Sequence, residues 1–380
     1  MQYRSFGKLD WKGSALGFGC MRLPAVDGRQ SSGNVDEAEA IRMIRHAIDH
    51  GVNYCDTAYM YHEGKSELIL GKALLDGYRE RIRLATKLPV YFVQGPQDFD
   101  RFLSEQLTKL QTDHIDFYLL HGLSKATWTN VVLKHGLLGL AEKALADGRI
   151  RHLGFSFHDN YEAFEEIVNG SNLWSFCQIQ YNYMDIENQA GTRGLKLAAD
   201  KGLAVVIMEP LLGGRLADPP PAIAETIAGD QAHRSPAQLA FDWLWDQPEV
   251  SVVLSGMSAM SQVEQNLRFA DASRVGKLTA ADQALIARVR EQYQARIPIP
   301  CTKCGYCMPC PNDVNIPANF DLFNYAKAYE DVSSAKFRYG FMLKEGQRAA
   351  ACIDCDTCEN MCPQHIPISD WMPKVSELLG

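Results

Sequence analysis

Short apolar runs alternate with longer helical patterns from Gly17 to about Arg296, and this alternation limits the possible folds more than any other feature of the chain. The apolar runs are continuous, which is typical of strands that are buried on both faces. Eight strand–helix units over about 280 residues match the count and length of a (β/α)8 TIM barrel. The expected strands are Ala15–Gly19, Asn53–Asp56, Ile82–Lys87, Ile115–Leu120, Ile150–Phe155, Phe176–Tyr181, Ala204–Met208 and Val250–Ser255.

The segments between these strands have the helical period. In Asp98–Leu110, for example, apolar residues recur every fourth position. Asp36–His50 is a second predicted helix, with an apolar face formed by Ala40, Ile41, Ile44, Ala47 and Ile48. A doubly wound open sheet is the rival α/β fold, and it normally carries a GxGxxG turn after its first strand. Here Gly17–Met21 leads into no helix with that fingerprint, so the barrel is favoured.

Two cysteine-rich runs near the C-terminus predict two [4Fe–4S] clusters. The runs are Cys301-Thr-Lys-Cys304-Gly-Tyr-Cys307-Met-Pro-Cys310-Pro and Cys352-Ile-Asp-Cys355-Asp-Thr-Cys358-Glu-Asn-Met-Cys362-Pro. Three cysteines at this spacing bind one cluster, and a fourth cysteine before proline ligates the other cluster in two-cluster ferredoxins. The expected ligand sets are Cys301, Cys304, Cys307 and Cys362 for one cluster, and Cys352, Cys355, Cys358 and Cys310 for the other.

The alternatives are two zinc sites or four disulfides. Zinc sites normally use two CxxC pairs without a third cysteine at the same spacing. Disulfides need an oxidising compartment, and Met1–Phe6 lacks the apolar segment of a secretory signal. The first run departs from the common pattern because two residues, not three, precede Cys310. Clusters are the favoured interpretation, and their sensitivity to oxygen predicts a reducing cytoplasm.

Size and charge restrict the architecture and the partners. At 380 residues the chain exceeds the ~250–300 at which one core stops growing, so two domains are expected. These are a barrel over residues 1–296 and an α-helical ferredoxin-like domain over residues 297–380. The net charge of −8, without a long basic run, argues against nucleic acid as a partner. No stretch approaches the ~20 apolar residues of a membrane span.

The region between the two cysteine runs favours helices over the hairpins of a small bacterial ferredoxin. It is long, and it carries helical patterns: Leu322, Tyr325, Ala326 and Tyr329 fall on one face, and Ala335–Leu343 continues the period. Another helix is expected at Thr279–Arg296, before Pro298 and Pro300 break the pattern.

Polar residues occupy successive strand ends in the predicted barrel. Asp56 follows the second strand, Lys87 ends the third, His121 follows the fourth, Ser156 follows the fifth and Gln180 lies on the sixth. Each alone is compatible with a structural role, such as a cap or a satisfied core histidine. Catalytic residues of TIM barrels come from the carboxyl ends of several strands, so the set together favours an active site.

These residues and their flanking sequences resemble the aldo-keto reductase family. The resemblance covers about residues 1–275, and the opening Tyr3–Gly7 looks like the N-terminal hairpin of the family. The whole chain is similar to the subgroup fused to a ferredoxin-like domain. The matching segments are Asp56–Tyr61, Ser66-Glu67, Leu70–Lys72, Ala85–Lys87, Tyr118–His121, Leu153–Ser156, Gln180–Asn182, Glu209–Leu211, Gly213-Gly214 and Gln265–Leu267.

The resemblance implies reduction of an aldehyde or ketone, or oxidation of an alcohol, with a nicotinamide cofactor. It assigns Tyr61 as the acid, Lys87 and Asp56 as the residues that tune it, and His121 as a donor that orients the carbonyl. Free tyrosine has a pKa of about 10, and the adjacent Lys87 is expected to lower the pKa of Tyr61. Tyr59 competes for the phenol role, but only the spacing from Asp56 to Tyr61 matches the family.

The resemblance also implies a nucleotide site, formed by Ser156, Gln180, Met208, Gly213, Gly214, Ser258 and Asn266. Phe157 and Met208 stand where the family commonly has an asparagine and an aromatic residue, and Asn266 is expected at a helix start. Gly256–Gln262 lacks the lysine and arginine that usually hold a 2′-phosphate, so NADP(H) and NAD(H) are both expected. No flavin motif is visible, and a flavin stays an open alternative.

The two kinds of redox group raise a question of electron count. A hydride carries two electrons together, whereas each cluster exchanges one. Either a flavin mediates, or the substrate accepts single electrons, or the clusters are structural. The rival function is therefore an electron-transfer protein whose clusters exchange electrons with a ferredoxin-type partner, while the barrel binds a partner, a flavin or an atypical substrate. A non-catalytic binding protein stabilised by clusters is a third alternative.

Overall fold

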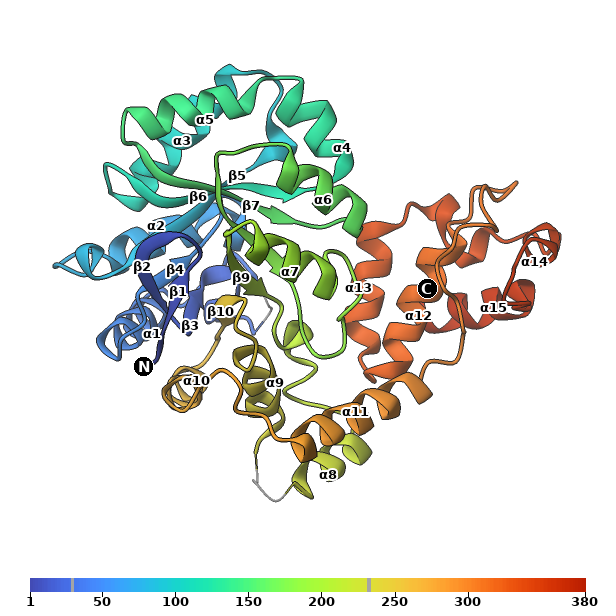
Figure 1. Cartoon of the computed structure of the whole chain (residues 1–380). Coiled ribbons are helices and arrows are strands. Elements are labelled where there is room, and N and C mark those ends of the chain that lie inside the picture. Colours follow the sequence, from blue (N-terminus) through green and yellow to red (C-terminus); the bar gives the residue numbers. More distant parts are fainter. Residues whose placement is uncertain (29–30, 231–233) are drawn as a thin grey trace. The chain divides into compact units, whose positions relative to one another are not determined.

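The computed structural model describes residues 1–28, 31–230 and 234–380, which form two compact units (Figure 1). The first unit comprises Met1–Leu216 and Ala237–Thr279, and the second comprises Ala217–Pro236 and Ala280–Gly380. The domain boundary predicted between residues 296 and 297 stays a prediction, and the second unit includes Ala217–Pro236 and Ala280–Arg296 in addition to the predicted residues 297–380. Among the helices of the described residues, none has both the length and the apolar character needed to cross a bilayer.

A closed barrel of eight parallel strands forms the centre of the first unit, so the predicted fold class is confirmed. The strands pair in the order β3 to β10, and β10 closes the barrel onto β3. All eight predicted strands are present, and the largest difference is at β6, which continues to Leu123. The strands are β3 (Leu16–Gly19), β4 (Tyr54–Asp56), β5 (Arg83–Leu88), β6 (Ile115–Leu123), β7 (Ile150–Phe157), β8 (Trp174–Gln180), β9 (Ala204–Met208) and β10 (Val250–Gly256).

An antiparallel hairpin of β1 (Tyr3–Phe6) and β2 (Leu9–Ser14) precedes the barrel. The fully buried Phe6 places its ring 4.6 Å from Phe117 and 5.9 Å from Phe176, near the amino ends of their strands. With Tyr54 and other inward-facing residues they form a core cluster inside the barrel. Because apolar side chains fill this end, the carboxyl ends of the strands are the place for a polar site.

Helices surround the barrel on its outer side (Figure 1). The Asp36 side chain accepts a hydrogen bond from the backbone N–H of Glu39 and so begins α1, whose Ala40 and Ile44 are buried in the larger core. The helices of this region are α1 (Glu37–Asp49), α2 (Ser66–Ala73), α3 (Gln97–Leu110), α4 (Lys125–Thr127), α5 (Leu137–Ala146), α6 (Tyr161–Asn169), α7 (Gly191–Asp200), α9 (Pro236–Trp245) and α10 (Met260–Asp271).

The second unit is helical, as predicted. Its apolar core includes Phe320, Phe323 and Val375, and the side chains of several cysteines pack against it. Asn315 begins α12 by accepting a hydrogen bond from the backbone N–H of Ala318. The helices are α8 (Pro221–Ala228), α11 (Ala280–Ala295), α12 (Ile316–Ala328), α13 (Val332–Met342), α14 (Thr357–Asn360) and α15 (Ile368–Leu379).

Candidate functional site

Neighbouring strands bring four of the predicted residues together at the carboxyl end of the barrel. Asp56 is the last residue of β4, Lys87 lies near the end of β5, and His121 lies on β6. Tyr61 follows β4 in a short helical turn. Because β4, β5 and β6 are adjacent strands of the barrel, the four side chains lie close together although they are distant in the sequence.

The Lys87 ammonium is the centre of this group. Its Nζ donates to Oδ1 of Asp56 at 2.6 Å, to the carbonyl oxygen of Thr57 at 2.8 Å and to the hydroxyl oxygen of Tyr61 at 3.2 Å. Burial lowers the pKa of Lys87, but the Asp56 carboxylate and the Tyr61 phenol outweigh burial and raise the pKa above its ordinary value. Lys87 therefore stays a cation inside the barrel.

Asp56 is the anion that compensates this cation. The side chains of Lys87 and Asp56 are only 1% and 4% exposed, so water does not solvate either charge and each depends on the other for compensation. Burial raises the pKa of Asp56, and the Lys87 ammonium opposes that rise. Nε2 of Gln178 also donates to Oδ2 of Asp56 at 3.3 Å.

Tyr61 lies between the lysine and the histidine. Its ring centre is 4.8 Å from Nζ of Lys87 and 6.1 Å from the ring centre of His121, which it meets edge to face. Burial raises the pKa of Tyr61, and the Asp56 carboxylate adds to the rise. Lys87 lowers the pKa of Tyr61, as predicted, but it cancels only part of the rise, so the net pKa lies above that of free tyrosine and not below it. In this arrangement Tyr61 holds its proton at neutral pH.

His121 is a neutral imidazole in this site. Burial, together with the positive charge of Lys87, lowers the pKa of His121 to about 3. A neutral imidazole carries one N–H donor and one acceptor nitrogen. His121 can therefore donate a hydrogen bond to an oxygen without adding a second cation beside Lys87.

Tyr59, the competing phenol, has a different environment. Its hydroxyl donates to Oε2 of Glu105 at 2.7 Å, and the hydrogen bond to that carboxylate raises the pKa of Tyr59 to about 12. The Nζ of Lys109 lies 3.8 Å from the Tyr59 ring centre. Of the two tyrosines, only Tyr61 has its hydroxyl within hydrogen-bonding distance of Lys87.

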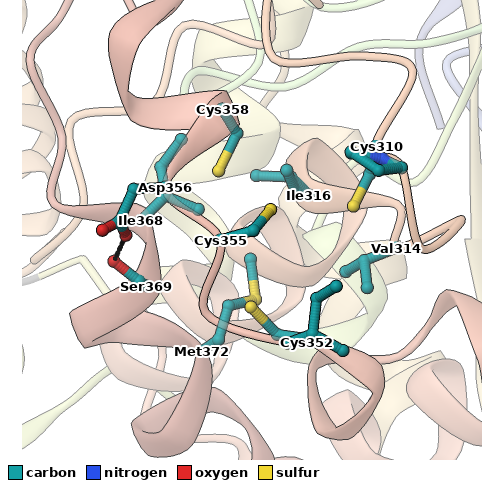
Figure 2. Close-up of a pocket in the computed structure, with 12 residues that line it drawn as sticks. Cys310, Val314, Ile316, Cys352, Cys355, Asp356, Cys358, Ile368, Ser369 and Met372 are labelled. Atoms are coloured by element: carbon teal, nitrogen blue, oxygen red, sulfur yellow. Dashed lines mark hydrogen bonds between the residues drawn. The ribbon is translucent and has the colours of Figure 1, made fainter.

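The eight C-terminal cysteines form two groups of four in the second unit. Cys301, Cys304, Cys307 and Cys362 line one cavity, and Cys310, Cys352, Cys355 and Cys358 line another. Each group takes three cysteines from one run and the fourth from the other, which is the predicted division. Figure 2 shows the four sulfur atoms of the second group facing a common space.

The donor chemistry of both groups fits [4Fe–4S] clusters. Four thiolates with an apolar lining, which includes Ile316 and Ile368 in both cavities, are the usual surroundings of such a cluster. Within the described parts of the chain, no three His, Cys, Asp or Glu side chains are arranged around a single ion.

A serine ties the second cysteine run to the helix that follows it. Oγ of Ser369, near the start of α15, donates to Oδ1 of Asp356 at 2.7 Å (Figure 2). The backbone N–H of Ser369 donates to Oε1 of Glu359 at 2.8 Å.

Burial raises the pKa of the Cys358 thiol to about 11, so the free thiol is protonated at neutral pH. Binding of iron by Cys358 would release this proton, because the thiolate is the form that binds the metal.

Comparison with known proteins identifies the barrel. Residues 15–290 match the model of the aldo/keto reductase family. The chain belongs to the aldo/keto reductase family. Residues 300–366 match the model of a 4Fe-4S dicluster domain, and all eight cysteines lie inside this segment. The predicted fusion of the two is thus confirmed.

Curated relatives and solved structures agree with this assignment. Probable aldo-keto reductase 1 from Glycine max is 26% identical over 294 residues, which cover 67% of this chain and 80% of that protein. The uncharacterized oxidoreductase YrpG from Bacillus subtilis (strain 168) is 30% identical over 236 residues, which cover 57% of this chain and 68% of the relative. The structure of aldo-keto reductase AKR11C1 from Bacillus halodurans (holo form) has a TM-score of 0.64 and 27% identity, covering 76% of this chain and 96% of the other.

A second solved structure supports the same fold. The thermostable aldo-keto reductase Tm1743, solved in complex with the inhibitor epalrestat, superposes with a TM-score of 0.62 at 25% identity. The match covers 76% of this chain and all of that one.

The predicted nucleotide residues of this aldo/keto reductase lie along the carboxyl ends of β7 to β10. Oγ of Ser156 accepts a hydrogen bond from the N–H of Gly122 at 2.8 Å, and Nε2 of Gln180 donates to Asp185 at 2.7 Å. Met208 ends β9. Gly213 and Gly214 have φ angles of +73° and +104°, which glycine adopts readily.

Two nucleotide predictions concern the last loop of the reductase barrel. The backbone N–H of Ser258 donates to Oε1 of Gln262 at 2.8 Å. The prediction that Asn266 begins a helix is wrong, because α10 begins at Met260. Asn266 is buried in the middle of α10, where its Nδ2 donates to Oγ of Ser255 at 3.1 Å.

Buried polar residues outside the predicted set hydrogen-bond to the candidate site residues or to their strands. The fully buried Glu67 accepts hydrogen bonds from Thr86 at 2.7 Å and from Gln106 at 2.6 Å. Gln106 also donates to the carbonyl oxygen of Lys87 at 3.0 Å. Gln178 contacts Asp56, as described above. A signal for Gln178 was available, because a polar residue in a continuously buried strand needs a partner.

Proposed function

We propose that this aldo/keto reductase reduces an aldehyde or ketone to the alcohol, or catalyses the reverse reaction, with NADPH or NADH. The observation that supports the proposal most directly is the Lys87 ammonium held between the Asp56 carboxylate and the Tyr61 hydroxyl. A reduced nicotinamide, when bound, supplies a hydride to the carbonyl carbon. The carbonyl oxygen must then gain a proton from the protein.

Tyr61 supplies that proton in our proposal. Its raised pKa keeps the phenol protonated at neutral pH, and the neutral His121 donates a hydrogen bond that orients the same oxygen. As the proton leaves Tyr61, negative charge grows on the phenol oxygen 3.2 Å from Nζ of Lys87. The ammonium stabilises that charge at the moment it forms, which is where electrostatic stabilisation accelerates a reaction.

The nicotinamide carboxamide is proposed to bind Ser156 and Gln180, with the nicotinamide ring against Met208. Gly213, Gly214, Ser258 and Asn266 are proposed for the rest of the nucleotide. Because Ser156 and Gln180 already have hydrogen-bond partners within the protein, they are held in fixed orientations. The two cysteine groups are proposed to hold [4Fe–4S] clusters, which exchange single electrons, in a reducing cytoplasm.

Oxidation of NADPH or NADH with a panel of aldehydes, measured without air on protein with full iron content, tests this proposal. Tyr61→Phe should reduce kcat by a factor of about 10² to 10⁴, the usual contribution of a positioned acid. Tyr59→Phe is the matched control, because it removes a phenol that bonds to Glu105 and should leave kcat within about twofold. Full turnover in Tyr61→Phe would refute the assigned acid.

One observation favours a second function, electron transfer through the clusters. Each cysteine group contains one exposed cysteine, Cys304 in the first and Cys355 in the second. A cluster with an exposed ligand is within reach of a ferredoxin-type partner. Bleaching of the clusters by a reduced low-potential ferredoxin, in the absence of nicotinamide, would support this role. An unchanged cluster spectrum would show that this ferredoxin does not reduce the clusters and would count against the electron-transfer role.

A further inference from the structure

The chain at His121 leaves the regular pairing of its strand. The register of β6 with β5 ends at Leu120, and its register with β7 shifts between Leu120 and Leu123. His121 and Gly122 fill this interval, and Gly122 has a φ angle of +64°, which glycine adopts readily. Bulges and similar breaks in a strand ladder often re-aim a side chain next to an active site. The direction of the His121 imidazole is therefore not set by regular strand pairing alone.

Two side chains hold the backbone of Gly122 at this break. Oγ of Ser156 accepts a hydrogen bond from its N–H at 2.8 Å, and the hydroxyl of Tyr91 donates to its carbonyl oxygen at 2.8 Å. Tyr91 lies in the helical turn Val90–Phe92, which follows β5. A Cβ atom on Gly122 would overlap the Tyr91 hydroxyl and lie 2.8 Å from Cζ of its ring. The bare backbone of Gly122 thus gives Tyr91 room to bind the residue that follows His121.

The ring of Tyr91 also contacts the imidazole of His121. The two ring centres lie 6.3 Å apart in an edge-to-face arrangement, and Tyr61 makes the same kind of contact with His121 at 6.1 Å. Aromatic pairs are favourable at such separations and angles. Among the described residues, none forms a hydrogen bond with a ring nitrogen of His121. The two tyrosine rings therefore limit the rotation of an imidazole that is otherwise free to turn.

The orientation of this imidazole matters to the proposed reaction. A neutral imidazole has a single N–H donor, and that donor has to point at the carbonyl oxygen on which negative charge develops. Of the two tyrosines, Tyr61 is the proposed acid and gives its proton to the same oxygen. The hydroxyl of Tyr91 is instead engaged with Gly122. Tyr91 can therefore hold the imidazole without taking part in proton transfer.

We propose that Tyr91 is a positioning residue of this reductase, which holds His121 in the orientation that donates to the substrate carbonyl. The inference rests on the proposed function. The ring of Tyr91 limits the rotation of the imidazole, and its hydroxyl fixes the backbone of the next residue. The Tyr91 side chain is 57% exposed, so a smaller side chain here leaves no buried cavity and should preserve the fold.

Steady-state reduction of the aldehyde that the wild type reduces fastest, with kcat and KM determined separately on iron-loaded protein without air, tests this inference. Tyr91→Ala should lower kcat by about ten- to a hundredfold, since a misplacement of about 1 Å can cost about a hundredfold, and KM should change little. Tyr91→Phe keeps the ring and loses only the hydroxyl, so most of kcat should return. The matched control is Tyr3→Ala, which should leave kcat unchanged. Tyr3 is 49% exposed, and its hydroxyl likewise donates to a glycine carbonyl, that of Gly51, at 3.0 Å.

The double variant His121→Gln/Tyr91→Ala gives the readout that a merely structural role would not move. Because Tyr91 is proposed to act through His121, its loss should lower kcat by less than about twofold once His121 is replaced. If the losses in kcat of the two single variants multiply in the double variant, Tyr91 acts independently of His121 and the inference is overturned.

The other outcomes separate the possible errors. An unchanged kcat in Tyr91→Ala overturns the inference, and a raised KM in that case makes Tyr91 a wall of the substrate site. An equal loss in Tyr91→Phe and Tyr91→Ala overturns the role of the ring, and an equal loss in Tyr3→Ala overturns the inference as a whole. Full activity of His121→Gln overturns the orienting role of His121 and this inference with it, but leaves the acid Tyr61 in place. Wild-type protein that reduces no aldehyde or ketone overturns the proposed function and the inference together.

Discussion

Tyr59 and Tyr61 direct their hydroxyls at groups of opposite charge, although one residue separates them in the chain. The Tyr61 hydroxyl oxygen lies 3.2 Å from the Lys87 ammonium, and the Tyr59 hydroxyl donates to the Glu105 carboxylate at 2.7 Å. A phenolate at Tyr61 would be stabilised by its neighbour, whereas one at Tyr59 would be repelled. This difference decides which of the two phenols suits proton transfer.

The buried pair of Lys87 and Asp56 predicts an asymmetric effect on stability. Lys87→Met leaves the Asp56 carboxylate buried without its cation, which should cost about 3–5 kcal/mol. The double variant Lys87→Met/Asp56→Asn should regain most of this loss, because replacing both members of a buried pair is often nearly neutral. Urea unfolding followed by tryptophan fluorescence measures both. A double variant no more stable than Lys87→Met would contradict the account.

The direction of the Tyr61 pKa predicts the alkaline limit of activity. A raised pKa means that the phenol keeps its proton to higher pH than free tyrosine, whose pKa is about 10. Carbonyl reduction consumes this proton. The kcat should therefore stay level through neutral pH and fall only above about pH 10, where the phenol begins to lose its proton. Steady-state rates against pH, at saturating substrate, measure the limit. A fall in kcat near neutral pH would show that the phenol is more acidic than this structure indicates.

Much of this architecture could be predicted because its signals are local. A strand that is buried on both faces has to be continuously apolar, so β9 is predicted to the residue as Ala204–Met208. The cysteine spacings define the two groups of four because a cluster takes ligands at fixed intervals. The candidate reductase residues can be proposed from the sequence because each lies in a short segment that resembles the aldo/keto reductase family.

The remaining features depend on several loops at once. The net pKa of Tyr61 is set by its burial, which the chain near Tyr61 does not encode. Arg22 has no pattern around it, although its side chain packs against Gly213 in the turn after β9 and against Gly256 at the end of β10. The start of α10 was misplaced because Ala259 precedes it without a side-chain cap, so the usual N-terminal signal is missing.

His121 predicts how stability depends on pH. Its pKa is about 3 in the folded protein and about 6.5 in an unfolded chain, so below pH 6.5 the unfolded state binds a proton that the folded state does not. The contribution of His121 to stability is therefore complete above pH 6.5 and is lost as the pH falls towards 3. His121→Gln removes this titration, so its melting temperature should fall less than that of the wild type between pH 7.5 and pH 5. Parallel curves for the two proteins would place the His121 pKa near its ordinary value.

The division of the cysteines between two cavities predicts which pairs of substitutions act on the same cluster. Cys362 lines the cavity of Cys301, although its own run supplies the other cavity. Cys362→Ala and Cys301→Ala should each remove about half of the iron and sulfide, and the double variant should lose no more than either one, because both disrupt one cluster.

Cys362→Ala combined with Cys352→Ala is the matched comparison, since it disrupts both groups and should remove nearly all the iron. If each run instead bound its own cluster, the two double variants would exchange outcomes: Cys362→Ala/Cys352→Ala would keep half of the iron, and Cys362→Ala/Cys301→Ala would lose it. Iron and sulfide content, measured on protein purified without air, distinguishes the two arrangements. Because the fourth ligand of each cluster comes from the other run, each cluster would join the two cysteine runs, and loss of either cluster should also lower the melting temperature of the second unit.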